Sequence, residues 1–288
     1  MTGAVRRSRW GLALMVLPPV LWLVLLQVVP LALILVYSFS RRTAYGGIEY
    51  TFTLANYTRF LQPIYLKVLS DSLAVALITT LIVLVVAYPF AWHLARQPAE
   101  RRGRLLLLVV IPFWTNSLIL TYAWKVILRA DGPVNQILTA LGLAPGPVQL
   151  LYTKPAAILG LVYVLLPYMI LPLYLSIEKL DPSTVRAAYD LGAGPVQAFR
   201  RVIFPLTLPG VVAGALLVFI PTLELFYISD LLGGAQMVLV GNLIQREFLE
   251  ARNWPFGAAA SIIVTGVTLL LVWVYVRWFS PGGVEELI

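Results

Sequence analysis

Two acidic side chains stand in an apolar stretch of the sequence, where a charge is costly. Glu224 lies within the run 221–226, and Asp230 follows six residues later. A carboxylate inside a membrane is a functional candidate by default, because its desolvation must be offset by a partner. Either side chain could attract a cation such as an organic ammonium group. Alternatively, Glu224 could bond to a neighbouring helix, and Asp230 could cap the turn before Gly233 and Gly234.

Aromatic side chains near the same apolar stretches could hold an ammonium group against a ring face. Each such contact contributes about 0.5–2 kcal/mol. The candidates are Trp114, Tyr122, Trp124 and Tyr227. The same residue types also form the aromatic belt at a membrane surface, so both roles stay open. Asn116 and Ser117 could line a polar path or form a hydrogen bond between helices.

Composition excludes several kinds of reactive centre. The chain has no cysteine and one histidine, His93, which rules out thiolate chemistry and a histidine-rich metal centre. No G-x-x-x-x-G-K-[S/T] sequence is present, so no P-loop can hold a nucleotide. An intramembrane enzyme would need a convergent set such as Ser/His/Asp, which one histidine and few acids disfavour. We therefore expect no catalytic residue, no metal ligand and no cofactor bound by this chain.

The candidate residues must be positioned by helices that cross a membrane. Of the 288 residues, 60% are hydrophobic and 12% are charged, whereas a soluble domain has about 25% charged residues. A spanning helix needs about 20 apolar residues. Six stretches qualify, at 11–37, 70–95, 105–128, 156–177, 209–231 and 257–279. The first is too long for the apolar core of a signal peptide, so we expect a retained helix in an all-α polytopic protein.

Basic residues predict the orientation of these spans. With the N-terminus inside, more Lys and Arg side chains fall on the inner side than on the outer side. The bias is sharpest in the short loop 96–104, which contains four arginines at positions 96, 101, 102 and 104. We predict that both termini face the cytoplasm. The net charge of +8 is then explained by basic cytoplasmic loops and needs no nucleic-acid partner.

The inner loop 178–208 predicts a helix, a turn and a second helix. Asp181 can cap the backbone N–H groups of a helix whose first position is Pro182. Gly192 suits the left-handed residue that ends this helix. We expect a second helix to start at Pro195 and to end before the next proline, because the residue before a proline avoids the α conformation.

The same loop resembles the EAA loop of ATP-binding-cassette (ABC) importer permeases, and we call it the EAA-like loop. The family pattern is E-A-A-x-x-x-G, followed by an apolar stretch and a proline. The resemblance implies that this loop docks on a partner ATPase through Arg186, Ala187, Ala188, Asp190, Gly192, Ala193, Phe199 and Pro205. Arg186 stands where the family has its leading glutamate, so an electrostatic contact of that glutamate would be lost or inverted.

Five further stretches resemble the permeases of spermidine/putrescine importers, the PotB-like members of the MetI-like permease family. They are PFWTNSLI at 112–119, LLPYM at 165–169, SIEKLD at 176–181, LFYISDLLGG at 225–234 and WPFGAA at 254–259. The resemblance implies the MetI-like fold, with six transmembrane helices in a single permease domain over residues 1–288. The helix at 11–37 would be peripheral, and the other five spans would form the core.

The resemblance also implies a function and a set of partners. The chain would carry polyamines across the bacterial cytoplasmic (inner) membrane without catalysing a reaction itself. The expected substrate path uses Glu224, Asp230, Tyr227, Trp114, Asn116, Tyr122 and Trp124. The partners would be a second, PotC-like permease, two PotA-like ATP-binding subunits that hold ATP and Mg²⁺, and a PotD-like substrate-binding protein.

Two alternatives stay open at this point. The same machine could carry another small cationic solute, such as ferric iron or thiamine. A secondary transporter would instead work alone on an ion gradient and show paired interrupted helices in two halves. No internal repeat is evident in the sequence, and this alternative leaves the EAA-like loop unexplained.

Overall fold

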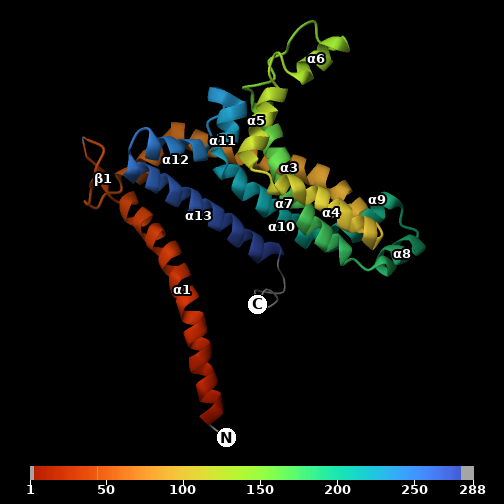
Figure 1. Ribbon diagram of the computed structural model, residues 1–288, viewed down its shortest axis with the longest axis horizontal. Helices are drawn as coiled ribbons and strands as arrows, with labels where there is room; N and C mark the ends of the chain where they lie inside the picture. The colour runs from red at the N-terminus through yellow and green to blue at the C-terminus, as the bar shows by residue number, and fades with distance from the viewer. Residues whose placement is uncertain (1–2, 44, 280–288) are drawn as a thin grey trace. The chain divides into compact units, whose positions relative to one another are not determined.

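The computed structural model describes residues 3–43 and 45–279, and these residues are mostly helical (Figure 1). The α-helices are α1 (Gly3–Ser38), α2 (Ala55–Phe60), α3 (Pro63–Ala95), α4 (Ala99–Trp114), α5 (Ser117–Ile127), α6 (Pro133–Ala140), α7 (Lys154–Glu178), α8 (Pro182–Asp190), α9 (Pro195–Ala198), α10 (Phe204–Glu224), α11 (Phe226–Ile228), α12 (Val240–Leu249) and α13 (Trp254–Phe279). Two π-helical segments, η1 (Phe199–Ile203) and η2 (Ser229–Gly233), and a 3₁₀ segment, η3 (Gly234–Gln236), complete the helical structure. A short antiparallel hairpin pairs β1 (Arg41–Arg42) with β2 (Ile48–Glu49).

The expected spans are present as helices, and two of them are interrupted. Among the described residues, five helices are long and apolar enough to cross a membrane, and α4 with α5 makes a sixth if the bent pair counts as one span. The pair is bent by 81°. The expected span 105–128 thus corresponds to a bent pair of helices. The expected span 209–231 is also interrupted, since α10 ends at Glu224.

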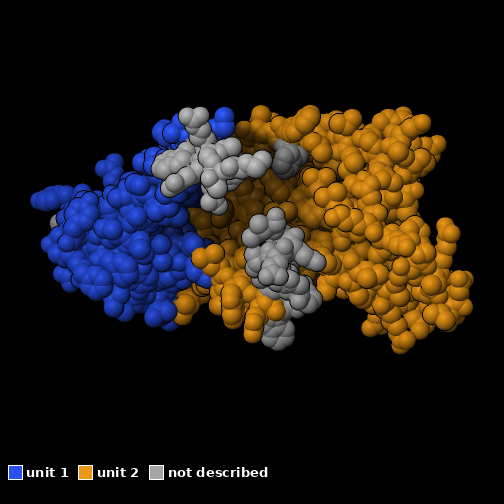
Figure 2. All heavy atoms as spheres, turned by 90° about the horizontal axis from the view of Figure 1, so that it is seen from below, with its two compact units in different colours: residues 1–63, 244–266 blue, residues 64–243, 267–288 orange. Residues whose placement is uncertain are grey.

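The chain divides into two compact units, which Figure 2 draws in different colours. Unit 1 combines the chain up to Pro63 with Ile244–Gly266, and unit 2 combines Ile64–Leu243 with the chain from Val267 onward. In unit 1, the guanidinium of Arg59 lies 4.2 Å from the centroid of the Phe256 ring. Within the same unit, the Arg42 side chain donates a hydrogen bond of 2.8 Å to the backbone oxygen of Ala251.

Unit 2 is built around α7, which packs most extensively against α10. Its buried core includes Leu161, Leu165, Met169 and Leu173 from α7. Close approach of the two helices depends on Gly214. A Cβ atom at this position would lie 2.5 Å from the Met169 sulfur and 3.3 Å from its backbone oxygen. Small residues at such crossings let membrane helices pack backbone against backbone.

The EAA-like loop folds as its sequence predicts at the start and end of α8. The Asp181 carboxylate accepts a 2.8 Å hydrogen bond from the backbone N–H of Ser183, and Pro182 is the first helical residue. Gly192 has a φ of +82°. The next N–H, of Ala193, bonds to the backbone oxygen of Ala188 at 3.0 Å, which completes a Schellman motif.

The second helix of this loop does not end before Pro205, and that prediction is wrong. The chain is helical without interruption from α9 through η1 into α10. A proline lacks the N–H that an α-helix needs at an interior position. The π turn of η1 comes directly before it, and there the Phe204 N–H bonds to the Phe199 backbone oxygen, five residues earlier. The altered bonding lets the helix pass through the proline.

Candidate functional site

Two helix interruptions in unit 2 border a single cavity. The first lies between α4 and α5, where Thr115 is extended and the Asn116 side chain caps α5. The second lies at Leu225, whose φ of −75° and ψ of 58° take the chain out of α10. Thr115 and Leu225 both line the cavity, so the two interruptions meet at one place.

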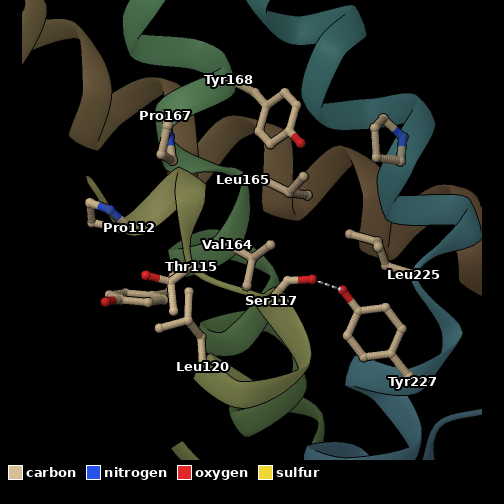
Figure 3. A pocket seen from close by; sticks show the side chains of 12 residues that line it. Pro112, Thr115, Ser117, Leu120, Val164, Leu165, Pro167, Tyr168, Leu225 and Tyr227 are labelled. Atoms are coloured by element: carbon tan, nitrogen blue, oxygen red, sulfur yellow. Dashed lines mark hydrogen bonds between the residues drawn. The ribbon is translucent and has the colours of Figure 1, made fainter. Parts of the chain in front are cut away.

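The cavity encloses about 140 Å³ between α4, α5, α7, α10 and α11 (Figure 3). Its lining consists of Pro112, Thr115, Ser117, Leu120, Tyr163, Val164, Leu165, Pro167, Tyr168, Pro221, Leu225 and Tyr227. None of these side chains carries a formal charge at neutral pH. The polar groups in the lining are the hydroxyls of Thr, Ser and Tyr.

A hydrogen bond joins the two interrupted helices across the cavity. The Tyr227 hydroxyl donates to the Ser117 Oγ atom at 2.7 Å, as the dashed line in Figure 3 marks. The two residues are 110 positions apart in sequence. Behind the lining, the Trp124 ring meets the Tyr163 ring edge-on with 5.5 Å between centroids. Aromatic rings from three elements therefore surround or support this cavity.

The two acidic candidates do not line the cavity. Glu224 is the last residue of α10 and is exposed. Within the part of the chain that the structure describes, its carboxylate makes no hydrogen bond or ion pair. Asp230 is half-buried in η2, and its Oδ1 atom accepts a 2.7 Å hydrogen bond from the Asn242 amide. Glu224 is thus available to a ligand, whereas Asp230 belongs to an internal network.

Asn242 is the centre of that network, and sequence reasoning missed it. Its side chain is fully buried. The amide nitrogen also donates to the Phe226 backbone oxygen at 3.1 Å. The Oδ1 atom accepts from the Leu239 N–H at 2.9 Å and from the Ser229 hydroxyl at 2.8 Å. This one side chain fixes α11, η2 and the start of α12, and no local sequence pattern marks it.

The other substrate-path candidates are dispersed. Trp114 is 75% exposed at the end of α4. Tyr122 is half-exposed, with the Lys125 ammonium 5.9 Å from its ring centroid. Asn116 serves as a helix cap, since its Oδ1 atom accepts from the Leu118 N–H at 2.8 Å. Of the predicted residues, Tyr227 lines the cavity, and so does Ser117, whose predicted bond between helices is confirmed.

Two tyrosines in the cavity lining were not predicted as site residues. Tyr163 and Tyr168 both come from α7, five positions apart, with Pro167 between them in the lining. The stretch 165–169 was noted only for its resemblance to other proteins. The run gives no indication of which face of α7 meets the two interruptions, because the helix is apolar on all sides.

The EAA-like loop has one buried and one exposed side. Val185 and Ala188 are buried, and α8 contacts α9 and η1. Arg186, Ala187 and Asp190 are exposed. Ala188 therefore packs within the chain, whereas Ala187 beside it is accessible, and a contact of either residue with an ATPase stays a prediction.

Apolar side chains continue this exposed side. Tyr189 is 45% exposed, Leu191 88% and Val196 71%. The loop is anchored to α3 by Phe199, whose ring meets the Tyr88 ring at 5.4 Å between centroids.

Hydrogen bonds from the Ser183 backbone and hydroxyl lower the pKa of the Asp181 carboxyl, so the cap is ionised at neutral pH. The loop thus presents a rigid surface of apolar and charged groups.

Comparisons with known proteins agree with this arrangement. Residues 8–282 match the family described as "Binding-protein-dependent transport system inner membrane component". The chain is 51% identical over 255 residues to the spermidine/putrescine transport system permease protein PotB of Escherichia coli (strain K12), covering 88% of this chain and 93% of that protein. It is 48% identical over 256 residues to PotB of Haemophilus influenzae, covering 89% and 90%.

A solved structure gives the same fold. A chain of the bacterial alginate ABC transporter, in complex with an alginate pentasaccharide-bound periplasmic protein, superposes with a TM-score of 0.78. The superposition covers 96% of each chain at 18% sequence identity. The protein is therefore a multi-pass membrane protein of the binding-protein-dependent transport family, with the MetI-like fold of ABC importer permeases.

Proposed function

We propose that this chain carries polyamines, spermidine and putrescine, through the membrane as one permease of an ABC importer. The observation that carries the proposal is the 51% identity to a spermidine/putrescine permease over 93% of that protein's length. The matched region covers 88% of this chain. The cavity chemistry described above is compatible with an elongated, multiply charged amine.

The cavity offers ring faces and hydroxyls, and these suit a transient cation site. An ammonium group gains about 0.5–2 kcal/mol from each ring face that it meets. Hydroxyl oxygens of Ser117 and Thr115 can accept its hydrogen bonds. A fixed carboxylate inside the cavity would bind a multiply charged amine too tightly for release, since conduction requires binding that is favourable but weak.

Glu224 supplies attraction near the cavity without entering it. The Glu224 side chain is exposed, and the next residue, Leu225, lines the cavity. A single negative charge at this place raises the local concentration of a cation before it meets the ring faces. Asp230 has a structural part in this account, because Asn242 holds its carboxylate.

The cavity must widen for transport. Its volume of about 140 Å³ is well below the roughly 300–1,000 Å³ of ordinary small-molecule sites. The structure therefore represents a closed arrangement for a polyamine. Separation of Tyr227 from Ser117 would part the two interrupted helices and enlarge the space.

In our proposal, ATP hydrolysis on partner chains supplies the energy that widens the cavity. One of two ATP-binding subunits would dock on the exposed side of the EAA-like loop, where Ala187, Leu191 and Val196 are accessible. A second permease would complete the path, and a substrate-binding protein would deliver the polyamine. The basic loop 96–104 and the EAA-like loop would face the cytoplasm, together with both termini.

Family membership disfavours the secondary transporter, although the structure has two interrupted helices. Interrupted helices therefore do not distinguish a secondary transporter from an ABC importer permease. The choice of cargo is tested by uptake of radiolabelled spermidine and putrescine into vesicles that contain the assembled importer, its binding protein and ATP. Unlabelled polyamine should compete, and ferric iron or thiamine should not. Uptake of thiamine or iron in place of polyamine would contradict the proposed cargo.

A further inference from the structure

An apolar groove and a basic pocket lie along the same helices of unit 2. The groove encloses about 380 Å³, and its lining includes Val86, Phe90, Leu105, Leu108 and Ile170 from α3, α4 and α7. Tyr163 supplies the only hydroxyl among the side chains of this lining. The groove shares Pro112, Tyr163 and Pro167 with the cavity, and its other lining residues have no part in the proposed substrate path.

The basic pocket encloses about 590 Å³ at the end of these helices that adjoins the EAA-like loop. Arg96, Arg102 and Arg186 line it, together with Trp92 and Glu178. Arg102 forms an ion pair with Glu178, so these two charges offset each other. The Arg96 guanidinium lies 3.8 Å from the centroid of the Trp92 ring.

Two positive charges in this pocket therefore remain uncompensated by its lining. Arg96 and Arg186 are exposed, and neither forms an ion pair with another residue of the described ranges. Asp181 is within electrostatic reach of Arg186, but its carboxylate is already bonded to Ser183. The pocket thus favours an anion and repels a polyamine.

Helix geometry aligns the groove and the pocket along α4 and α7, whereas on α3 Phe90 of the groove and Trp92 of the pocket lie on different sides of the helix. Arg102 of the pocket and Leu105 and Val109 of the groove are spaced so that they lie on the same side of α4. On α7, Ile170 of the groove and Ile177 of the pocket share a side in the same way. Seven residues of helix rise by about 10 Å, which is shorter than the acyl chain of a phospholipid.

We propose that an anionic phospholipid occupies the groove and the pocket together. Its phosphate would accept charge-assisted hydrogen bonds from Arg96 and Arg186, and one acyl chain would lie in the groove. Both halves of the site are needed for this occupant. A soluble anion would leave the groove empty, and a zwitterionic lipid would gain less from the two arginines.

The site would connect the spans to the EAA-like loop. Its lining includes Pro182, Val185 and Tyr189, which belong to α8. A lipid bound here would therefore contact α3, α4, α7 and the loop at once. Loss of the lipid should loosen the loop relative to the spans.

Native mass spectrometry of the assembled importer tests the proposal. The full-length chain, purified with its co-purifying subunits, is titrated with phosphatidylglycerol and, separately, with phosphatidylcholine. Arg96→Gln removes one headgroup contact, and Arg104→Gln is its control, because Arg104 is exposed in the same segment but lies outside the pocket. Leu108→Trp fills the groove, and Leu107→Trp is its control, being 55% exposed and outside the groove.

We expect phosphatidylglycerol to be retained in preference to phosphatidylcholine. Arg96→Gln should weaken retention about fivefold, on the scale of one arginine charge at an anionic headgroup, and Leu108→Trp should weaken it by filling the groove, while both controls bind as wild type. Inorganic phosphate should not displace the lipid. Equal retention of both lipids, displacement by phosphate, or loss of binding in the controls as well would overturn the proposal. So would retention by the isolated chain but not by the assembled importer, since a partner subunit would then cover the groove.

Discussion

The EAA-like loop and the cavity are stabilised by contacts of very different range. In the loop, the Asp181 cap and the Schellman motif at Gly192 join residues no more than five positions apart. In the cavity, the bond between Tyr227 and Ser117 spans 110 positions. The start and end of α8 can therefore form locally, whereas the cavity exists only when several spans are correctly placed. A change in the loop should alter energy transfer, and a change around the cavity should alter stability or opening.

The largest effect is expected at the network that supports the cavity. Asn242→Ala removes four hydrogen bonds and leaves their partners unsatisfied in a buried place, with a loss of about 1–3 kcal/mol or more in the free energy of unfolding. The measurement is the thermal unfolding midpoint of the detergent-purified protein. Gln236→Ala is the control, because Gln236 is exposed in the neighbouring η3 segment. Equal midpoints for the two variants would show that the network is not needed.

A smaller stability effect, with a large functional effect, is expected in the loop. Gly192→Val forces a β-branched residue to a φ of +82°, which costs about 1–2 kcal/mol. No atom of a neighbouring residue lies within 4 Å of an added Cβ there, so the strain is confined to the backbone. ATP-driven uptake should fall sharply while membrane insertion stays normal. Gly194→Val is the matched control, since Gly194 has equal space and an ordinary φ of −69°.

If Gly192→Val and Gly194→Val transported equally well, the shape of this turn would not matter for coupling.

A second comparison separates the two sides of α8. Ala187 is exposed and Ala188 is buried, so Ala187→Trp should impair ATPase stimulation without lowering the unfolding midpoint. Loss of stability in Ala187→Trp would mean that its side chain packs within the chain.

The bond across the cavity should have a moderate effect. Tyr227→Phe removes only the hydroxyl that donates to Ser117, and a net contribution of about 0.5–1.5 kcal/mol would shift the closed–open equilibrium up to about tenfold. Basal ATPase activity of the assembled importer should rise in the absence of polyamine. Tyr122→Phe serves as the control, because Tyr122 lies outside the cavity. Unchanged basal activity in Tyr227→Phe would mean that the bond does not hold the cavity closed.

The smallest expected effect separates the two acids. Glu224→Gln keeps size and hydrogen bonding but removes an exposed charge, and we expect polyamine uptake to fall about fivefold at low ionic strength. High salt should reduce the difference. Asp230→Asn should instead lower the unfolding midpoint, since Asn242 binds its carboxylate. If Glu224→Gln took up polyamine at the wild-type rate, Glu224 would not attract the cation. The attraction would then come from the aromatic rings or from a partner permease.

These two regions also differ in how far the sequence predicts them. Local rules predict the start of α8 from Asp181 and Pro182 and its end from Gly192. Each of these positions is confirmed. The helix that starts at Pro195 is predicted to end before Pro205, because the proline rule considers only local bonding. A π turn and the packing of α10 on α7 override that rule.

The cavity shows the opposite limit. Tyr227 is predicted as an aromatic ring for an ammonium group, but Tyr163 and Tyr168 lie in an apolar helix with no polar face to mark them. The interruptions of the spans at Thr115 and Leu225 likewise depend on where other helices lie. Periodicity reveals that a helix spans the membrane, yet it does not reveal which of its faces meets a break in another helix.

Cysteine labelling at the cavity tests the central claim most directly, because the chain contains no native cysteine. Thr115→Cys places a thiol in the cavity lining, and Ala123→Cys places one at an exposed position of α5 outside it. Both variants are treated with a small cationic thiol reagent in vesicles of the assembled importer during ATP turnover. We predict that spermidine slows modification of Thr115→Cys and leaves that of Ala123→Cys unchanged. Equal modification of Thr115→Cys with and without spermidine, in a variant that still transports, would contradict passage of the polyamine through this cavity.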